Sequence, residues 1–328
     1  MGFLRDDYLD IFKGFGIFFV VFGHVTHIGA LRDYIWNFHM PLFFFVSGLL
    51  YNSNLKFKDF LLKRIKSIYI PYIFFFFVTF CYWLLIERRV RGDEYSILHQ
   101  LIGLPYGTYE GNHLYFNGAL WFLPCLFATE LLFYPIGRIK NKIGIITFLL
   151  LFYIVGTVLR MNDIDYLPFG LHTAFFATIF YGFGYLSKQI QKYISDTKSG
   201  YQWMLIIVCF CIQLLCNKDY SSKINEFPFP YFLIATIGIL LYLTLSIRIK
   251  KNKLIEFIGK NSLVIFAFQE PVYRAVIFAF SKILNIEVES LRGNIFYSII
   301  IACVSILIIV PAILIYNKYI RQRINNLY

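Results

Sequence analysis

The sequence predicts an all-α, polytopic integral membrane protein. Of its 328 residues, 59% are hydrophobic and 20% are aromatic, and the mean hydropathy is +0.63. A soluble domain of this length would have too little core to hide so much apolar surface. Lys and Arg lie mostly in short segments between apolar runs, as they do in membrane proteins. The formal charge of +12 therefore indicates membrane topology, and no nucleic-acid partner is expected.

Apolar runs of about 20 residues, which cross roughly 30 Å of hydrocarbon as helices, predict about ten transmembrane helices. Two of the runs, 36–51 and 202–216, are short, so they predict tilted or partly broken helices. The runs are 11–30, 36–51, 67–86, 118–137, 143–159, 171–187, 202–216, 229–247, 258–280 and 294–316.

The basic residues predict the orientation. With the N-terminus inside, 20 of the 31 Lys and Arg residues fall on the inner side and 9 on the outer side. Since Lys and Arg collect in cytoplasmic loops, both termini are expected in the cytoplasm, with an even number of spans. We expect one transmembrane domain over residues 1–328, in the plasma (inner) membrane. The longest connection, 87–117, is then outside and is either an acceptor-binding element or a connector.

The first apolar run carries ionisable groups, which are costly in lipid and mark functional candidates. Lys13 and His24 are eleven residues apart. In an α-helix this separation amounts to a rotation about 20° more than three full turns, so both side chains lie on the same face of the helix, roughly 16 Å apart along its axis. His27 follows on nearly the same stripe. A cation near the cytosol can pair with phosphate, and a neutral imidazole can accept a proton from an attacking hydroxyl. Alternatively, Lys13 reaches the interface and the histidines bridge helices.

Four strings occur in order along the chain: DYLDIFKGFGIFFVVFGH at 7–24, FHMPLFFFVSG at 38–48, GALWFLPCLF at 118–127 and IGKNSLVIFAF at 258–268. Together they resemble the acyltransferase type 3 family of membrane O-acyltransferases, whose hallmark is a basic residue, ten intervening residues and a His. Lys13 and His24 fit this spacing. The second string is most similar to sugar O-acetylases of the family.

The resemblance implies a reaction. An acetyl group would pass from cytoplasmic acetyl-CoA to a hydroxyl of an envelope saccharide, which is polymeric, lipid-linked or free, and no metal is expected. His24 would serve as general base or as an acetylated intermediate. A transporter or flippase for a lipid-linked saccharide is the competing class, although the paired broken helices that it should have are not evident. A longer acyl donor and an inactive membrane scaffold also remain open.

The resemblance also implies a donor site. KRIKSIYIPY, at 63–72, is similar to a basic motif of the family at the cytoplasmic end of the third helix, which meets the phosphates of the donor. Arg64 fits its first position, whereas the second falls on Ser67, with Lys66 one residue early. We expect Lys13, Lys63, Arg64 and Lys66 to bind the donor; ordinary cytoplasmic loop charge is the alternative.

The remaining candidates concern the acceptor, which His27 is also expected to contact, and the catalytic base. His39 would orient the acceptor or His24, or else cap a helix start. Trp121 would stack on a sugar or belong to the aromatic belt, and Asn117 would contact the acceptor or cap the following helix. Glu130 lies in mid-membrane and needs a hydrogen bond or a cation from another helix, or else stays protonated. It is a candidate acceptor-site residue that would tune an imidazole, or else a contact between helices.

The late string ends with a departure from the family. Gln269 stands where the family often has a His, and Gln cannot take a proton at neutral pH. Glu270 and Arg274 have the i, i+4 spacing of an intrahelical salt bridge, which indicates a structural role.

Overall fold

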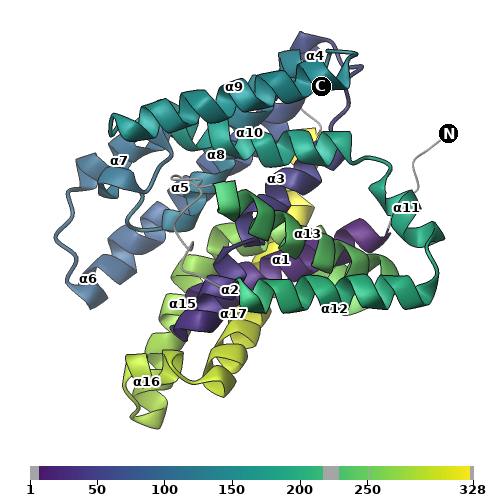
Figure 1. Cartoon of the computed structure of the whole chain (residues 1–328). Helices are drawn as coiled ribbons and strands as arrows, with labels where there is room; N and C mark the ends of the chain where they lie inside the picture. The colour runs from purple at the N-terminus through teal and green to yellow at the C-terminus, as the bar shows by residue number, and fades with distance from the viewer. Residues whose placement is uncertain (1–6, 217–228, 250, 326–328) are drawn as a thin grey trace. The chain divides into compact units, whose positions relative to one another are not determined.

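The computed structural model describes residues 7–216, 229–249 and 251–325, and over these residues every regular element is a helix (Figure 1). The chain divides into two compact units, each of which gathers segments that lie far apart in the sequence. The first comprises Met1–Tyr51, Phe180–Ile265 and Val276–Ile306, and the second comprises Asn52–Ile179, Phe266–Ala275 and Leu307–Tyr328.

The first unit is built mainly from eight helices: α1 (Asp7–Val25), α2 (Gly29–Trp36), α3 (His39–Leu49), α11 (Ile190–Asp196), α12 (Ser199–Leu215), α13 (Phe229–Ile249), α14 (Lys253–Lys260) and α16 (Val288–Arg292). The unit boundaries fall inside α10 (Leu171–Leu186), α15 (Ser262–Leu284) and α17 (Ile295–Ile315). The second unit holds α4 (Phe57–Arg64), α5 (Ile70–Tyr82), α6 (Arg88–Arg91), α7 (Ile97–Tyr106), α8 (Phe122–Ile136), α9 (Lys142–Met161) and α18 (Gln322–Asn325).

Shorter helical turns complete the second unit. π-Helical turns cover Ile65–Tyr69, Trp83–Glu87 and Tyr316–Arg321, and 3₁₀ turns cover Glu110–Asn112, Gly118–Trp121 and Pro168–Gly170.

Each of the ten predicted apolar runs contains a helix. Seven helical stretches of the described chain are long and apolar enough to cross a membrane: Tyr8–Val25, Phe57–Arg91, Gly118–Ile136, Lys142–Met161, Phe229–Ile249, Ser262–Leu284 and Ile295–Ile324. The other three runs form α3, α10 and α12, with 11, 16 and 17 residues. The all-helical membrane class is therefore confirmed, while the count of ten spans and the side of the termini stay predictions.

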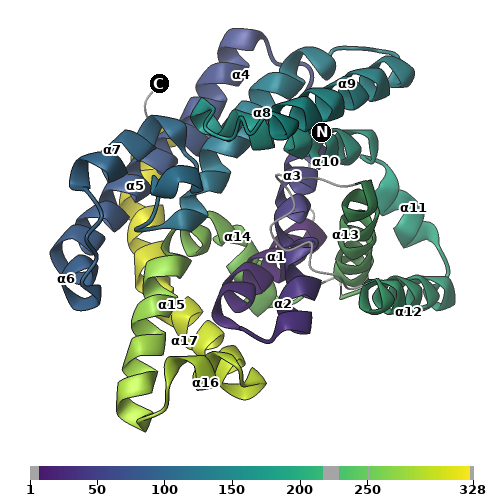
Figure 2. The same cartoon turned by 60° about the vertical axis from the view of Figure 1, so that its left-hand side comes forward.

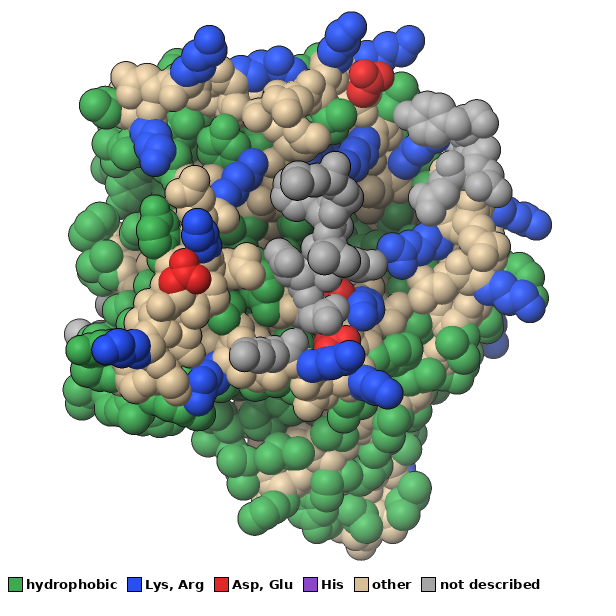
Figure 3. Space-filling model, turned by 90° about the vertical axis from the view of Figure 1, so that its right-hand side faces the viewer, with side chains coloured by type: hydrophobic (Ala, Val, Ile, Leu, Met, Phe, Trp, Pro, Cys, Tyr) green, Lys and Arg blue, Asp and Glu red, His purple; other side chains and the backbone are tan. Residues whose placement is uncertain are grey.

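Large apolar side chains cover much of the protein surface. On the face drawn in Figure 3, wide hydrophobic areas are exposed, and the charged side chains are mostly Lys and Arg. Leu215 at the end of α12 is 85% exposed. Such surface suits contact with lipid and not with water.

Glycines allow α14 to pack directly on α1, as the turned view of Figure 2 shows. A Cβ atom on Gly259 would lie 1.7 Å from the carbonyl oxygen of Asp10, and one on Gly14 would lie 2.3 Å from the carbonyl oxygen of Ile255. Close backbone approach at small residues is a usual form of helix packing in membranes. The contact fixes the part of α1 that carries Lys13.

The long connection 87–117 has a fixed structure of its own. It contains α6, α7 and the 3₁₀ turn Glu110–Asn112. The fully buried amide of Gln100 braces it, because Nε2 donates to the carbonyl oxygen of Asn112 at 2.7 Å and Oε1 accepts from the backbone N–H of Tyr115 at 2.9 Å.

Candidate active site

His24 lies at the C-terminal end of α1, among aromatic rings from the next two helices. Its ring centroid is 5.3 Å from that of Trp36 in α2 and 6.4 Å from that of His39 in α3, with interplanar angles of 60° and 90°. The structure thus brings His39 close to His24, which is one of the groups that His39 was expected to orient. Trp36 was not predicted as a site residue.

His39 is buried, and its hydrogen bond fixes its tautomer. Nδ1 lies 3.0 Å from the carbonyl oxygen of Ile35. Because a carbonyl only accepts, Nδ1 carries the proton, and Nε2 of the neutral ring is an acceptor. His39 can therefore receive a hydrogen bond from a neighbouring group on its Nε2 side.

Lys13 lies on the same uninterrupted helix as His24, as their spacing predicted. Its Nζ is 2.6 Å from Oδ1 of Asp10, one turn earlier, and Lys260 of α14 lies 3.9 Å from Oδ2 of the same carboxylate. Asp10 is only 1% exposed, and the Lys13 side chain is 17% exposed. A buried acid thus holds the predicted donor cation in place. The i, i+3 spacing in the sequence was the signal for this pair.

His27 lies beyond the end of α1, so it does not continue the helical stripe of Lys13 and His24. Its Nδ1 is 2.8 Å from Oε2 of Glu289 in α16. A contact between His27 and the acceptor stays a prediction.

The basic motif of the second unit forms an ion pair with a carboxylate from the predicted span 118–137. Arg64, the last residue of α4, forms an ion pair with Glu130 of α8, and its guanidinium lies 5.2 Å from the ring centroid of Phe60. Glu130 was expected to need a cation from another helix, and Arg64 supplies it. Lys63 is exposed, and Lys66 falls within the π-helical turn Ile65–Tyr69.

Asn117 precedes the short 3₁₀ turn Gly118–Trp121 before α8, and Trp121 ends that turn. The expected capping role of Asn117 is wrong, because its side chain makes no cap hydrogen bond; Nδ2 donates instead to the carbonyl oxygen of Ala267 at 2.8 Å. The cap comes from Glu270, whose Oε2 accepts from the backbone N–H of Ala119 at 2.7 Å. Trp121 is partly exposed at the end of the turn.

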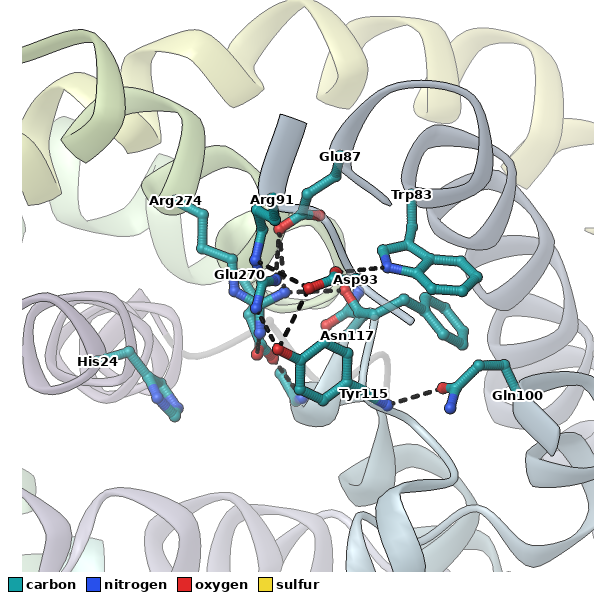
Figure 4. Close-up of polar contacts among 12 residues, drawn as sticks. His24, Trp83, Glu87, Arg91, Asp93, Gln100, Tyr115, Asn117, Glu270 and Arg274 are labelled. Carbon is teal, nitrogen blue, oxygen red and sulfur yellow. Dashed lines mark hydrogen bonds and ion pairs between the residues drawn. The ribbon is translucent and has the colours of Figure 1, made fainter. Parts of the chain in front are cut away.

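A network of charged side chains, in which Glu87 and Glu270 are buried, ties α15 to the long connection 87–117 (Figure 4). Arg274 pairs with Glu270, which confirms the predicted salt bridge. Its Nη1 also lies 3.3 Å from Oε1 of Glu87 and 3.1 Å from the carbonyl oxygen of Phe116. Arg91 lies 3.0 Å from the same Glu87 oxygen. The network holds the end of the long connection against α15, which supports a structural role for it.

A family model described as an acyltransferase domain matches residues 6–316, nearly the whole chain. The chain belongs to the acyltransferase 3 family. No curated protein and no solved structure matches it. The matched range of this acyltransferase 3 protein includes the helix with Lys13 and His24, the basic motif and the late helix in which Gln269 is buried.

Ionisable side chains gather at several places in this acyltransferase 3 protein. In the described part of the chain, no group of three or more His, Cys, Asp or Glu residues could hold a metal ion. At the C-terminal end of α1 two imidazoles come together, and nearer the N-terminus of the same helix a carboxylate holds a lysine. An imidazole can move a proton, and an ammonium group can bind phosphate.

Proposed function

We propose that the chain is a membrane O-acetyltransferase, which transfers an acetyl group from cytoplasmic acetyl-CoA to a hydroxyl of an envelope saccharide. One observation carries the proposal: Lys13 and His24 lie on the single helix α1, inside the range that matches the acyltransferase domain. Nearby, His39 presents its ring edge-on to that of His24.

In the proposed reaction, His24 accepts the proton of the acceptor hydroxyl. The hydroxyl oxygen then attacks the carbonyl carbon of the thioester, so that a C–O bond forms as the C–S bond breaks. The thiolate of CoA leaves and takes up the proton from His24. In the two-step form, His24 carries the acetyl group between donor and acceptor. His39, with Nε2 as acceptor, orients either His24 or the incoming hydroxyl.

On the donor side, Lys13 and Arg64 are assigned to the phosphates of acetyl-CoA, with added charge from Lys63 and Lys66. Each of the first two is held by a buried acid, Asp10 or Glu130. Donor phosphate would share these cations with the acids. On the acceptor side we retain His27, Asn117 and Trp121.

Binding of acetyl-CoA tests the proposal. The purified full chain, in lipid nanodiscs, is titrated with acetyl-CoA by calorimetry, together with Lys13→Met and Arg64→Met. Each substitution removes a charge-assisted contact, so each should weaken binding about tenfold or more. Lys282→Met is the control, since Lys282 is exposed at the end of α15 and lies outside the proposed site.

A wild-type chain that does not bind acetyl-CoA would contradict the proposal and favour the transporter or scaffold. Equal weakening by Lys282→Met would show a non-specific charge effect and would remove the donor site. Tighter binding of butyryl-CoA than of acetyl-CoA would indicate a longer acyl donor.

A further inference from the structure

The C-terminal end of α1 is held by residues that are distant in the sequence. An α-helix leaves its last four carbonyl groups without partners inside the helix, and in a membrane each one must be satisfied by other means. In α1 these carbonyls belong to the four consecutive residues Phe22, Gly23, His24 and Val25. His24, the proposed base, is therefore one of the residues whose backbone depends on outside partners.

All four carbonyls are satisfied. The backbone N–H of Thr26 donates to Phe22 at 2.9 Å. The indole N–H of Trp36 donates to Gly23 at 3.1 Å. The two remaining carbonyls share one side chain, because Arg292 of α16 donates from Nη2 to His24 at 2.8 Å and from Nε to Val25 at 3.0 Å.

Arg292 is itself fixed in place. Its carbonyl oxygen accepts from the backbone N–H of His27 at 2.9 Å and from the hydroxyl of Ser298 at 3.1 Å. One turn before it, Glu289 accepts a hydrogen bond from His27 at 2.8 Å, which lowers the pKa of the Glu289 carboxyl. α16 is thus linked to His27, just after α1, by one hydrogen bond from the His27 backbone and one from the His27 side chain.

On the other side of the helix end, Trp36 contacts both the backbone and the imidazole. Its N–H bonds the carbonyl before His24, and its ring packs 5.3 Å from the His24 ring. Gly23 permits this approach, since a Cβ atom there would lie 3.1 Å from the indole nitrogen and 2.8 Å from Cγ2 of Ile35.

We propose that Arg292 is a positioning residue for the acyl transfer: its forked guanidinium fixes the backbone of His24, so that the imidazole keeps its place beside Trp36 and His39. This inference rests on the proposed function. A planar guanidinium can donate to two adjacent carbonyls at once, whereas the ammonium of a lysine is a point charge on a flexible stem. A cation is also favourable at a helix C-terminus. Lysine at position 292 should therefore restore the function only in part.

The test compares Arg292→Gln, Arg292→Lys and Arg89→Gln in the full chain. Arg89 is an exposed arginine and serves as the matched control. Three quantities are measured: the initial rate of acetyl transfer from radiolabelled acetyl-CoA to glycan in inverted membrane vesicles, the Kd for acetyl-CoA in nanodiscs, and the NMR spectrum of ¹⁵N-labelled histidine side chains. His24→Ala is run alongside and identifies the His24 signal.

The expected result separates positioning from folding. Arg292→Gln should lower the rate roughly 10- to 100-fold, because small misplacement of a reacting group has effects of that size. Its Kd for acetyl-CoA should stay within about twofold of the wild-type value. The His24 signal should shift, while the signals of His99, His113 and His172, which belong to the second unit, should not. Arg292→Lys should have a rate between those of the wild type and Arg292→Gln. If Arg292→Gln is absent from the membrane, the comparison of Arg292→Lys with the wild type replaces it. Arg89→Gln should match the wild type.

Two kinds of result would overturn the inference. Wild-type rates in Arg292→Gln, together with loss of transfer in His24→Ala, would refute it and leave the proposed function intact. If Arg292→Gln instead loses donor affinity, thermal stability and all histidine signals together, Arg292 serves only to stabilise the fold by capping α1. Unchanged transfer in His24→Ala would refute the proposed function itself, and the inference with it.

Discussion

Two buried acids hold two of the four cations that are expected to meet the donor. Asp10 pairs with Lys13 inside one helix, whereas Glu130 pairs with Arg64 across two. Both acids are at most 2% exposed. A cation that is held in place before its ligand arrives loses less conformational freedom on binding, which favours affinity. The acids are therefore as much a part of the proposed donor site as the cations.

Substitution of Glu130 tests this pairing. Glu130→Gln leaves the guanidinium of Arg64, a side chain only 14% exposed, without its counter-charge. Loss of one partner of a buried pair should lower the free energy of unfolding by about 3–5 kcal/mol. Equilibrium unfolding of the wild type and the variant in mixed micelles measures this difference in the free energy of unfolding. The double variant Arg64→Met/Glu130→Leu should recover most of the loss, and a single-variant cost of less than about 1 kcal/mol would contradict the pairing.

For single residues, the sequence indicated which side chains need a partner, but it did not indicate which residue the partner is. Glu130 had to find a cation because a lone carboxylate is costly in lipid, but nothing in the local sequence indicated Arg64. Asn117 has the residue type of a helix cap, yet its amide bonds to Ala267, 150 residues later. Nothing in the sequence indicated that Lys66 lies in a π-helical turn, in which the rotation per residue differs from that of an α-helix.

At the scale of elements, the contact of α1 with α14 depends on the absence of side chains. Gly259 and Gly14 let the two backbones touch beside Asp10 and Lys13. The part of α1 that carries Lys13 is thereby coupled to the packing of α14, a short helix that follows α13. Any residue larger than glycine at this contact must push the helices apart.

Gly259→Ala tests the contact. Because its Cβ atom would overlap the carbonyl oxygen of Asp10, the substitution should lower the free energy of unfolding by about 1–3 kcal/mol or more and should weaken binding of acetyl-CoA. Gly200→Ala in α12 is the matched control, since no atom lies within 4 Å of its Cβ position, and its effect should stay within about 0.5 kcal/mol. Equal stability of the two variants would show that α14 packs less closely.

The apolar runs predicted the helices well, except where the chain bends inside a run. The run 36–51 was expected to be short or broken, and its helix begins only at His39, after Phe38 leaves the helical conformation with φ of −134°. Pro41 fits there because it lies in the first turn of α3, where a missing N–H does no harm. The run 11–30 likewise ends early, at Val25, which removes His27 from the helix.

At the scale of the whole molecule, the sequence predicted the class and family, whereas the long-range contacts came from the structure. Hydropathy and the ordered strings pointed to a helical membrane acyltransferase, and the family match confirms this membership. The contact of Arg292 with Val25 joins residues 267 positions apart, and no local pattern marks it. Composition limits what a segment can be, but packing decides which segments meet.

The central claim is that His24 serves acetyl transfer to an envelope glycan. Its most direct test is proton NMR of glycan from cells that carry the wild-type chain or His24→Ala at equal membrane level. We expect O-acetyl signals with the wild type and their loss with the variant, and the shifts would then identify the acceptor hydroxyl. The same O-acetyl signals from both strains would contradict it.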